Sequence, residues 1–215
     1  MSSNNIDNFL TTSLELENAL MGFLSINDRD SDKRLKASKI LCTIVFEHSE
    51  SVKILISTGN LTSATGLVRL QYEALVRAMW LLYAASDVAV DKLMAELTNE
   101  SAQRANKLPM LSEMLTKLEG KAPIEAMDAL NEFKEYSWKA LSSYVHGGIH
   151  AISRHSKGYP VEQLIQLLKI SNGLLIMAGM LLIILSGDPK QKGKIPSIQM
   201  QFKDCLPDFK QNSII

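Results

Sequence analysis

The sequence has no excess of charge of either sign and contains few cysteines. Its 23 basic and 23 acidic side chains cancel at neutral pH, and no long basic run interrupts the chain. A protein whose main partner is duplex nucleic acid usually has a basic excess or a basic face, so no duplex DNA is expected as a partner. The two cysteines, Cys42 and Cys205, lie too far apart for a metal-binding or disulfide pattern. We therefore expect reduced thiols in a cytoplasmic protein.

The chain also lacks a secretory signal and a long hydrophobic run. Residues 1–9 have neither the basic start nor the apolar stretch of a signal peptide. The most apolar run, Leu174–Leu185, has 12 residues, whereas a bilayer crossing needs about 20. We expect this run to be a buried core helix and predict no membrane span.

Strand patterns and internal repeats are nearly absent, and helical periodicity dominates. Apolar residues recur at three- and four-residue steps, and Gly, Pro and cap-forming side chains separate the periodic segments. We predict an all-α fold, an up-down bundle of five or six main helices in residues 1–187. Residues 188–215 are expected to be a C-terminal extension that is packed on the bundle or partly disordered. The helices are predicted at about 6–23, 33–58, 62–85, 86–106, 123–146 and 160–186.

The third predicted helix carries charge in a mostly apolar context. Arg69, Glu73 and Arg77 are spaced i, i+4, i+8 and form one stripe, with Tyr72 and Trp80 beside it. Buried charges need partners, and a Glu between two Arg on one face supplies them. The stripe is therefore either a structural ion-pair network, a face open to solvent, or a pocket in which an Arg binds an anion such as phosphate.

Three of the four histidines lie close together, at His146, His150 and His155. The glycines at 147 and 148 and the lack of an acidic residue between the histidines argue against a zinc site, so no metal or cofactor is predicted. His146 is a candidate general acid or base because histidine titrates near neutral pH. Alternatively, it forms a hydrogen bond that fixes the helix end, and the glycines permit close packing.

Two segments carry a resemblance to a known group of proteins. "GLVRLQYEALVRAMWLL" (66–82) and "YSWKALSSYVHGG" (136–148) resemble an uncharacterised bacterial all-helical family with an Arg-x-x-x-Glu helix and a helix ending in Ser-x-x-Val-His-Gly. That family is similar, distantly, to HEPN domains. The resemblance implies a bundle that dimerises, a polar region lined by Arg69, Glu73 and His146, and an RNase or nucleotide-binding role in defence or stress.

The sequence departs from active HEPN nucleases at one position. Those enzymes carry an Arg a few residues before the His, whereas here only Lys139 stands near the required place. A lysine is a point charge and lacks the two-pronged geometry with which Arg holds a phosphate. This departure weakens the nuclease interpretation.

Two functions remain, and the first is preferred on chemical grounds. The first is a dimeric interaction or regulatory module of HEPN-like type, expected to be a homodimer, in which the charged residues are structural. The alternative is a metal-independent RNase or nucleotide-binding protein, with RNA or a nucleotide as partner. Its catalytic candidates are His146 and Lys139, and its ligand-binding or polar cluster comprises Arg69, Glu73, Arg77, Tyr72, Tyr144 and His150.

Overall fold

The computed structural model describes residues 2–25, 32–191 and 193–207. Every regular element in these ranges is a helix, so the prediction of an all-α fold is confirmed. The five long helices are α1 (Ser2–Met21), α2 (Lys33–Ser57), α3 (Leu61–Tyr83), α7 (Ile124–Val145) and α9 (Val161–Ser186). The shorter elements are α4 (Asp87–Leu93), α5 (Asn99–Ala105), α6 (Leu111–Leu118), α8 (Ile149–Lys157), α10 (Lys194–Gln201) and the 3-10 turns η1 (Pro189–Gln191) and η2 (Lys203–Cys205).

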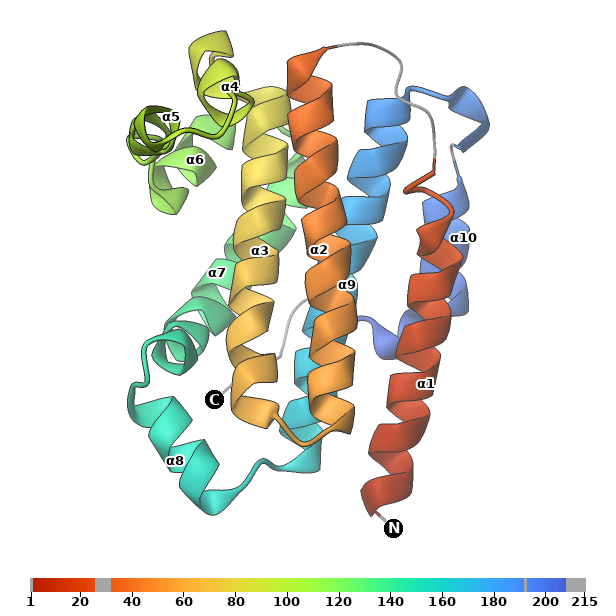
Figure 1. The fold of residues 1–215 in the computed structure, drawn as a ribbon. Coiled ribbons are helices and arrows are strands. Elements are labelled where there is room, and N and C mark those ends of the chain that lie inside the picture. Colours follow the sequence, from red (N-terminus) through yellow and green to blue (C-terminus); the bar gives the residue numbers. More distant parts are fainter. Residues whose placement is uncertain (1, 26–31, 192, 208–215) are drawn as a thin grey trace.

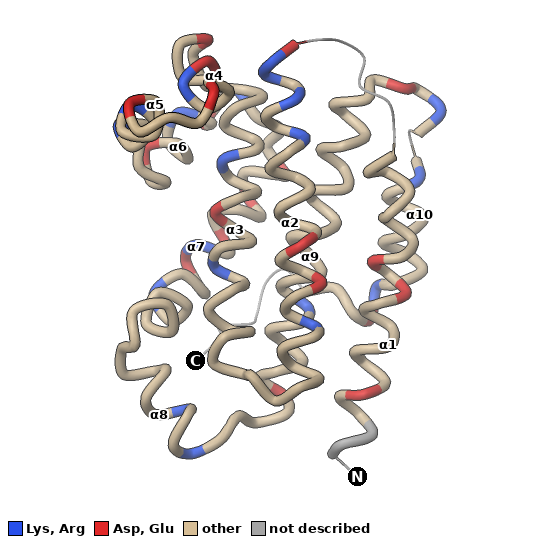
Figure 2. Tube along the Cα trace, in the orientation of Figure 1, with Lys and Arg blue, Asp and Glu red and all other residues tan. Residues whose placement is uncertain are grey.

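The long helices alternate in direction and surround a shared core (Figure 1). α2 packs along α3 and against α9, while α1 covers the other side of α9. α7 lies against α3 on the side away from α1, and α8 continues from its lower end. The short helices α4, α5 and α6 form a separate layer beside the upper end of α3. Charges of both signs are spread over these helices (Figure 2).

Buried polar side chains fix how α9 sits in the core. Ser171 donates to Gln71 Oε1 at 2.8 Å, and Gln71 Nε2 donates to the Ser171 carbonyl at 3.0 Å, which ties α9 to α3. Asn172 donates to Ser13 Oγ at 2.9 Å and to the Cys205 carbonyl at 3.0 Å, which ties α9 to α1 and η2. Because an unpaired buried polar group is costly, these bonds select one register of α9 among its apolar neighbours.

α9 is longer and more continuous than the apolar run suggested. Its 26 residues are, by length and composition alone, enough to cross a membrane. However, 72% of its most apolar window is buried inside the bundle, as in the core helix of a soluble protein. α9 agrees with the helix predicted over 160–186, and Ser171 and Asn172 do not interrupt it because buried hydrogen bonds accommodate their side chains.

The predicted boundaries differ most in the short helices. The single helix expected over 86–106 is two helices, because Ser86 and Thr98 each cap a separate start: the Ser86 side chain accepts from the Ala89 amide and Thr98 from the Ser101 amide. The segment after Gly148, which lies between the helices predicted over 123–146 and 160–186, forms α8. Beyond Gly187, α10 and η2 contact α9, and residues 208–215 of the predicted extension lie outside the described ranges.

The upper end of α3 is closed by a side chain from α2. Arg34 Nη1 donates to the Leu81 and Ala85 carbonyls at 2.6 and 2.8 Å, and Nη2 pairs with Asp87 at 2.6 Å. The last carbonyls of a helix have no partner within the helix, so Arg34 satisfies them and also fixes the start of α4.

Candidate functional site

The packing of α7 against α3 brings four side chains of the candidate site together. Arg69 and Glu73 lie on successive turns of α3, and Trp138 and His146 lie on one face of α7 because eight residues make about two turns. Arg69 Nε donates to Glu73 Oε1 at 2.9 Å, and Arg69 Nη1 lies 3.5 Å from His146 Nε2. The Arg69 guanidinium lies 4.2 Å from the centre of the Trp138 ring. We call these four residues the α3–α7 cluster.

The α3–α7 cluster is partly open to solvent. The side chains of Arg69 and Glu73 are 15% and 25% exposed, and His146 is exposed. Trp138 covers the face of the guanidinium, and Glu73 holds its Nε edge. The result is a fixed cation with an exposed imidazole next to it, which is an arrangement that can bind an anion or polarise a phosphate oxygen.

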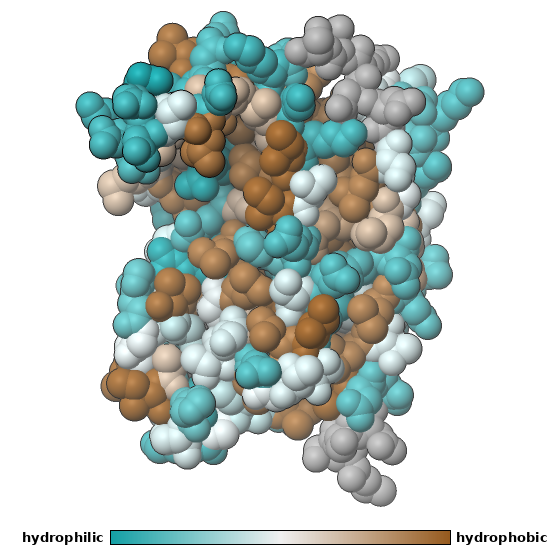
Figure 3. Space-filling view, in the orientation of Figure 1, coloured by the Kyte–Doolittle hydropathy of each residue, from teal (hydrophilic) through white to brown (hydrophobic). Residues whose placement is uncertain are grey.

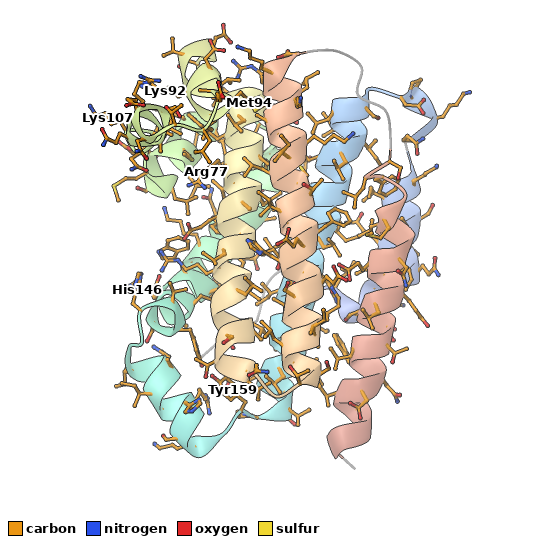
Figure 4. The ribbon with its side chains drawn as sticks, viewed as in Figure 1. Arg77, Lys92, Met94, Lys107, His146 and Tyr159 are labelled. Atoms are coloured by element: carbon orange, nitrogen blue, oxygen red, sulfur yellow. The ribbon has the colours of Figure 1, made fainter. Side chains whose placement is uncertain are left out.

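The end of α7 shows why a histidine precedes two glycines. His146 is the C-cap, and its backbone amide donates to the Ser142 carbonyl at 3.1 Å. Gly147 has φ +64°, the left-handed conformation that usually requires glycine after a helix. At Gly148, an added Cβ would lie 2.5 Å from Ser143 Oγ and 3.3 Å from Ser143 Cα. The two glycines therefore stop the helix and let α8 start close beside it, which leaves His146 exposed at the corner (Figure 4).

A family comparison covers most of the chain, from within α2 onward. A model of a family of unknown function, DUF6988, matches residues 42–208. The chain belongs to DUF6988. No curated protein and no solved structure gave a match. The DUF6988 match contains α3, α7 and α8, and therefore all four residues of the α3–α7 cluster.

A second polar group of the DUF6988 protein lies where α7, α8 and the start of α9 meet. Tyr144 is 6% exposed, and its ring lies 6.4 Å from that of His150 and 6.3 Å from that of Tyr159. Burial raises the pKa of Tyr144, Tyr159 adds to the shift, and nearby Gln163 and Arg154 oppose it. The Tyr159 hydroxyl lies 2.9 Å from that of Thr62, which connects this group to α3.

Tyr144 and His150 take no part in the contacts that join Arg69 to Glu73, Trp138 and His146. Within the described residues, Tyr144 Oη, His150 Nδ1 and Gln163 Oε1 are buried and have no hydrogen-bond partner. His150 is held through its backbone amide, which donates to Ser143 Oγ at 3.0 Å. A polar, enclosed place of this kind is suited to a bound water.

The remaining predicted site residues have other surroundings. Tyr72 is fully buried; its hydroxyl donates to the Leu130 carbonyl at 2.9 Å and its ring stacks on Phe133 at 4.1 Å. Burial raises its pKa far above the ordinary value, so Tyr72 is part of the core. Arg77 and Lys139 form no hydrogen bond or ion pair with any residue in the described ranges. Glu73 therefore pairs with Arg69, and the second ion pair expected with Arg77 is absent from the described residues.

Trp138 is the member of the α3–α7 cluster that the sequence analysis missed. It also packs edge-on against Tyr72, with ring centres 5.9 Å apart, and so links the cluster to the core. Its position eight residues before His146 was a usable signal, since that spacing returns to the same helix face. Within the described residues, no group of three or more His, Cys, Asp or Glu is placed to hold a metal ion.

Proposed function

We propose that this chain is a dimeric interaction module and that two copies meet through the α7–α8 side of the bundle. The observation that carries the proposal is the exposure of Ile149 and Ile152, which are 76% and 66% exposed on one face of α8. Val145, at the end of α7, is also exposed. Apolar atoms gather at the corner where Figure 1 places α8 (Figure 3), and exposed apolar patches often mark interaction sites.

The charges of α7 and α8 favour a second copy as the partner. The last turn of α8 carries Arg154, His155 and Lys157 without an acidic residue, whereas the first half of α7 carries Glu125, Asp128 and Glu132. In a two-fold dimer each surface meets its own equivalent in the reverse sense. The basic α8 end of one copy then faces the acidic α7 half of the other, with the isoleucines between them.

The resemblance of residues 66–82 and 136–148 to HEPN modules supports the same arrangement. It associates a helical bundle of this kind with dimerisation and with bacterial defence or stress, and we extend the proposal to such a role in the cytoplasm. In the dimer, His146 of each copy lies beside the contact surface, so the two α3–α7 clusters belong to one composite surface.

The dimer is tested by measuring mass in solution. In sedimentation equilibrium the wild-type protein is expected to be a dimer, and the variant Ile149→Asp/Ile152→Asp is expected to be a folded monomer by circular dichroism. Ile40→Asp, at an exposed isoleucine on α2, is the control and should remain dimeric. A monomeric wild type, or a double variant that still dimerises, would overturn the proposal.

A second candidate function, metal-independent cleavage of single-stranded RNA, is favoured by one observation, the 3.5 Å approach of Arg69 Nη1 to His146 Nε2. In such a reaction Glu73 accepts the proton of a 2′-hydroxyl, whose oxygen attacks phosphorus. The bond to the 5′-oxygen breaks, and His146 donates a proton to that leaving oxygen. A 2′,3′-cyclic phosphate is left, and Arg69 offsets the charge that develops on the phosphate oxygens.

The RNase candidate is tested in the presence of EDTA. Purified protein is expected to cleave single-stranded RNA, and His146→Ala is expected to lower the rate by about 10²–10⁴-fold. His48→Ala, on a helix that carries none of the cluster, is the control and should keep full activity. If wild-type and His146→Ala preparations cleave equally, or neither cleaves, the chain is not this enzyme.

A further inference from the structure

A cavity of about 380 Å³ opens beside the upper end of α3, away from the α3–α7 cluster. α4, the turn after α5 and the end of α6 form its other walls. Its lining includes Trp80, Lys92, Lys107, Lys117 and Lys121, together with the apolar side chain of Leu108. Lys92 and Lys107 lie on the same corner of the molecule in Figure 4. The volume is within the range of small-molecule sites.

The lining is strongly basic, although the chain as a whole is neutral. Four lysines and no acidic residue line the cavity. Asp87 pairs with Arg34 at 2.6 Å, Asp91 pairs with Lys33 at 2.7 Å, and Glu113 accepts from the Met110 amide at 2.7 Å. Glu119, which lies between Lys117 and Lys121 in the chain, is exposed and is not part of the lining. None of the four lysines forms an ion pair with a residue that the structure describes. Like charges gathered in this way repel one another, and a bound anion relieves that repulsion.

Trp80 also belongs to the lining of the cavity. It is 1% exposed, and its indole Nε1 is buried and donates to no acceptor in the described part of the chain. A buried donor without an acceptor is unfavourable. Arg77 lies one helical turn before Trp80, and it is a further cation without a partner among the described residues. In Figure 4 it lies on the side of α3 that faces α6.

We propose that this cavity binds a small molecule that carries two or more phosphate charges. The lysines supply mobile cations around the phosphates. Leu108, Val88 and the alanines of the lining provide apolar surface for the part of the ligand that is not phosphate. The site is made of residues 80–121 alone, so it does not depend on the dimer or on His146.

The test uses inorganic pyrophosphate and ADP as probes with the full chain. The variant Trp138→Phe leaves Trp80 as the only tryptophan, so a change in its fluorescence on titration reports this cavity. Isothermal titration calorimetry on the wild type gives the affinity independently. We expect both probes to bind, with affinity falling as salt rises, because the contacts are between exposed charges.

Two lysine variants locate the binding. Lys92→Gln/Lys121→Gln is expected to weaken binding of both probes by about tenfold or more, since hydrogen bonds to charged groups contribute about 1.5–3 kcal/mol. Lys36→Gln/Lys203→Gln, which removes two exposed lysines outside the cavity, is the control and should bind as the wild type does. Unchanged folding of each variant is checked by circular dichroism.

Three outcomes overturn the proposal. One is the absence of binding by either probe at low salt, and another is binding that the cavity variant leaves unchanged. The third is binding that Arg69→Gln abolishes while the cavity variant does not, because the phosphate would then occupy the α3–α7 cluster. The RNase test measures the effect of a change at His146 on cleavage, whereas this test measures the effect of changes at Lys92 and Lys121 on binding. Either proposal can therefore be overturned without the other.

Discussion

Lys53 and Glu17 form an ion pair inside the bundle, where α2 meets α1. Their side chains are 2% and 8% exposed, and Lys53 Nζ lies 3.4 Å from Glu17 Oε2. Lys53 also donates to Ser49 Oγ at 2.6 Å. Burial lowers the pKa of Lys53 and raises the pKa of Glu17, while each partner opposes the shift of the other. Both residues therefore depend on the pair to remain charged in the core.

Removing one member of this pair is expected to be far more harmful than removing both. Lys53→Met leaves the Glu17 carboxylate buried without a counter-charge, which should lower the free energy of unfolding by about 3–5 kcal/mol. Glu17→Leu/Lys53→Met should recover most of that loss, because no charge is then buried. Urea unfolding measures each value. The exposed pair Lys33–Asp91 is the comparison, and Lys33→Met should lower the free energy of unfolding by less than about 1 kcal/mol. If the losses in stability from the single changes at Glu17 and Lys53 simply add in the double variant, the two residues do not stabilise each other as a pair.

His48 on α2 predicts a dependence of stability on pH. Burial lowers its pKa from 6.5, and Glu47 opposes this shift. Because the folded state has the lower pKa, the unfolded state binds the proton more readily, and stability is lost as pH falls from about 6.5 toward the folded-state pKa. The melting temperature of the wild type should therefore decrease over this window more than that of His48→Gln. Parallel curves for the two proteins would show that His48 does not contribute.

At the scale of elements, the long helices were predictable because each has its own local signals. The start of α2 follows Asp32, whose side chain accepts from the Arg34 amide, and α9 ends at Gly187 in the left-handed conformation. The short helices were less predictable. α4 and α5 have seven residues each, and helices of that length depend on tertiary contacts more than on their own propensity.

The candidate site was predictable only in part, for the same reason. The spacing of Arg69 and Glu73 on one helix gave their ion pair directly, and the resemblance placed His146 beside them. The sequence does not show which way Arg77 faces, since that depends on the layer formed by α4–α6. The basic cavity could not be predicted either, because Lys92 of α4, Lys107 of the turn after α5 and Lys117 of α6 meet only in the folded chain.

The turn between α7 and α8 predicts a specific effect at Gly148. Gly148→Ala would place a Cβ within 2.5 Å of Ser143 Oγ, and this hydroxyl also accepts from the His150 amide. We expect a loss of about 1–3 kcal/mol in stability, as for other overpacked sites. Gly22→Ala is the control, since an added Cβ there meets no atom within 4 Å. Thermal unfolding measures both variants, and an equal effect would contradict the close approach of α8 to α7.

For the whole molecule, the main consequence is that one very apolar helix serves as the centre of a bundle. α1, α2 and α3 all contact α9, and α10 packs on it from the C-terminal side. A helix with this role has one set of residues enclosed by protein and another that reaches the surface. In a membrane-spanning helix, by contrast, residues on several faces would contact lipid. The two environments respond differently to an added charge.

Charge substitutions along α9 therefore test the architecture as a whole. Ala178 is fully buried and Met180 is 41% exposed, although they are only two residues apart. Ala178→Asp should bury an unpaired carboxylate and prevent folding or lower stability by more than about 4 kcal/mol, whereas Met180→Lys should change stability by about 0.5 kcal/mol or less. Urea unfolding of protein purified without detergent measures both variants. If Met180→Lys is as damaging as Ala178→Asp, or if the wild type requires detergent to remain in solution, α9 does not have the enclosed position that organises the bundle.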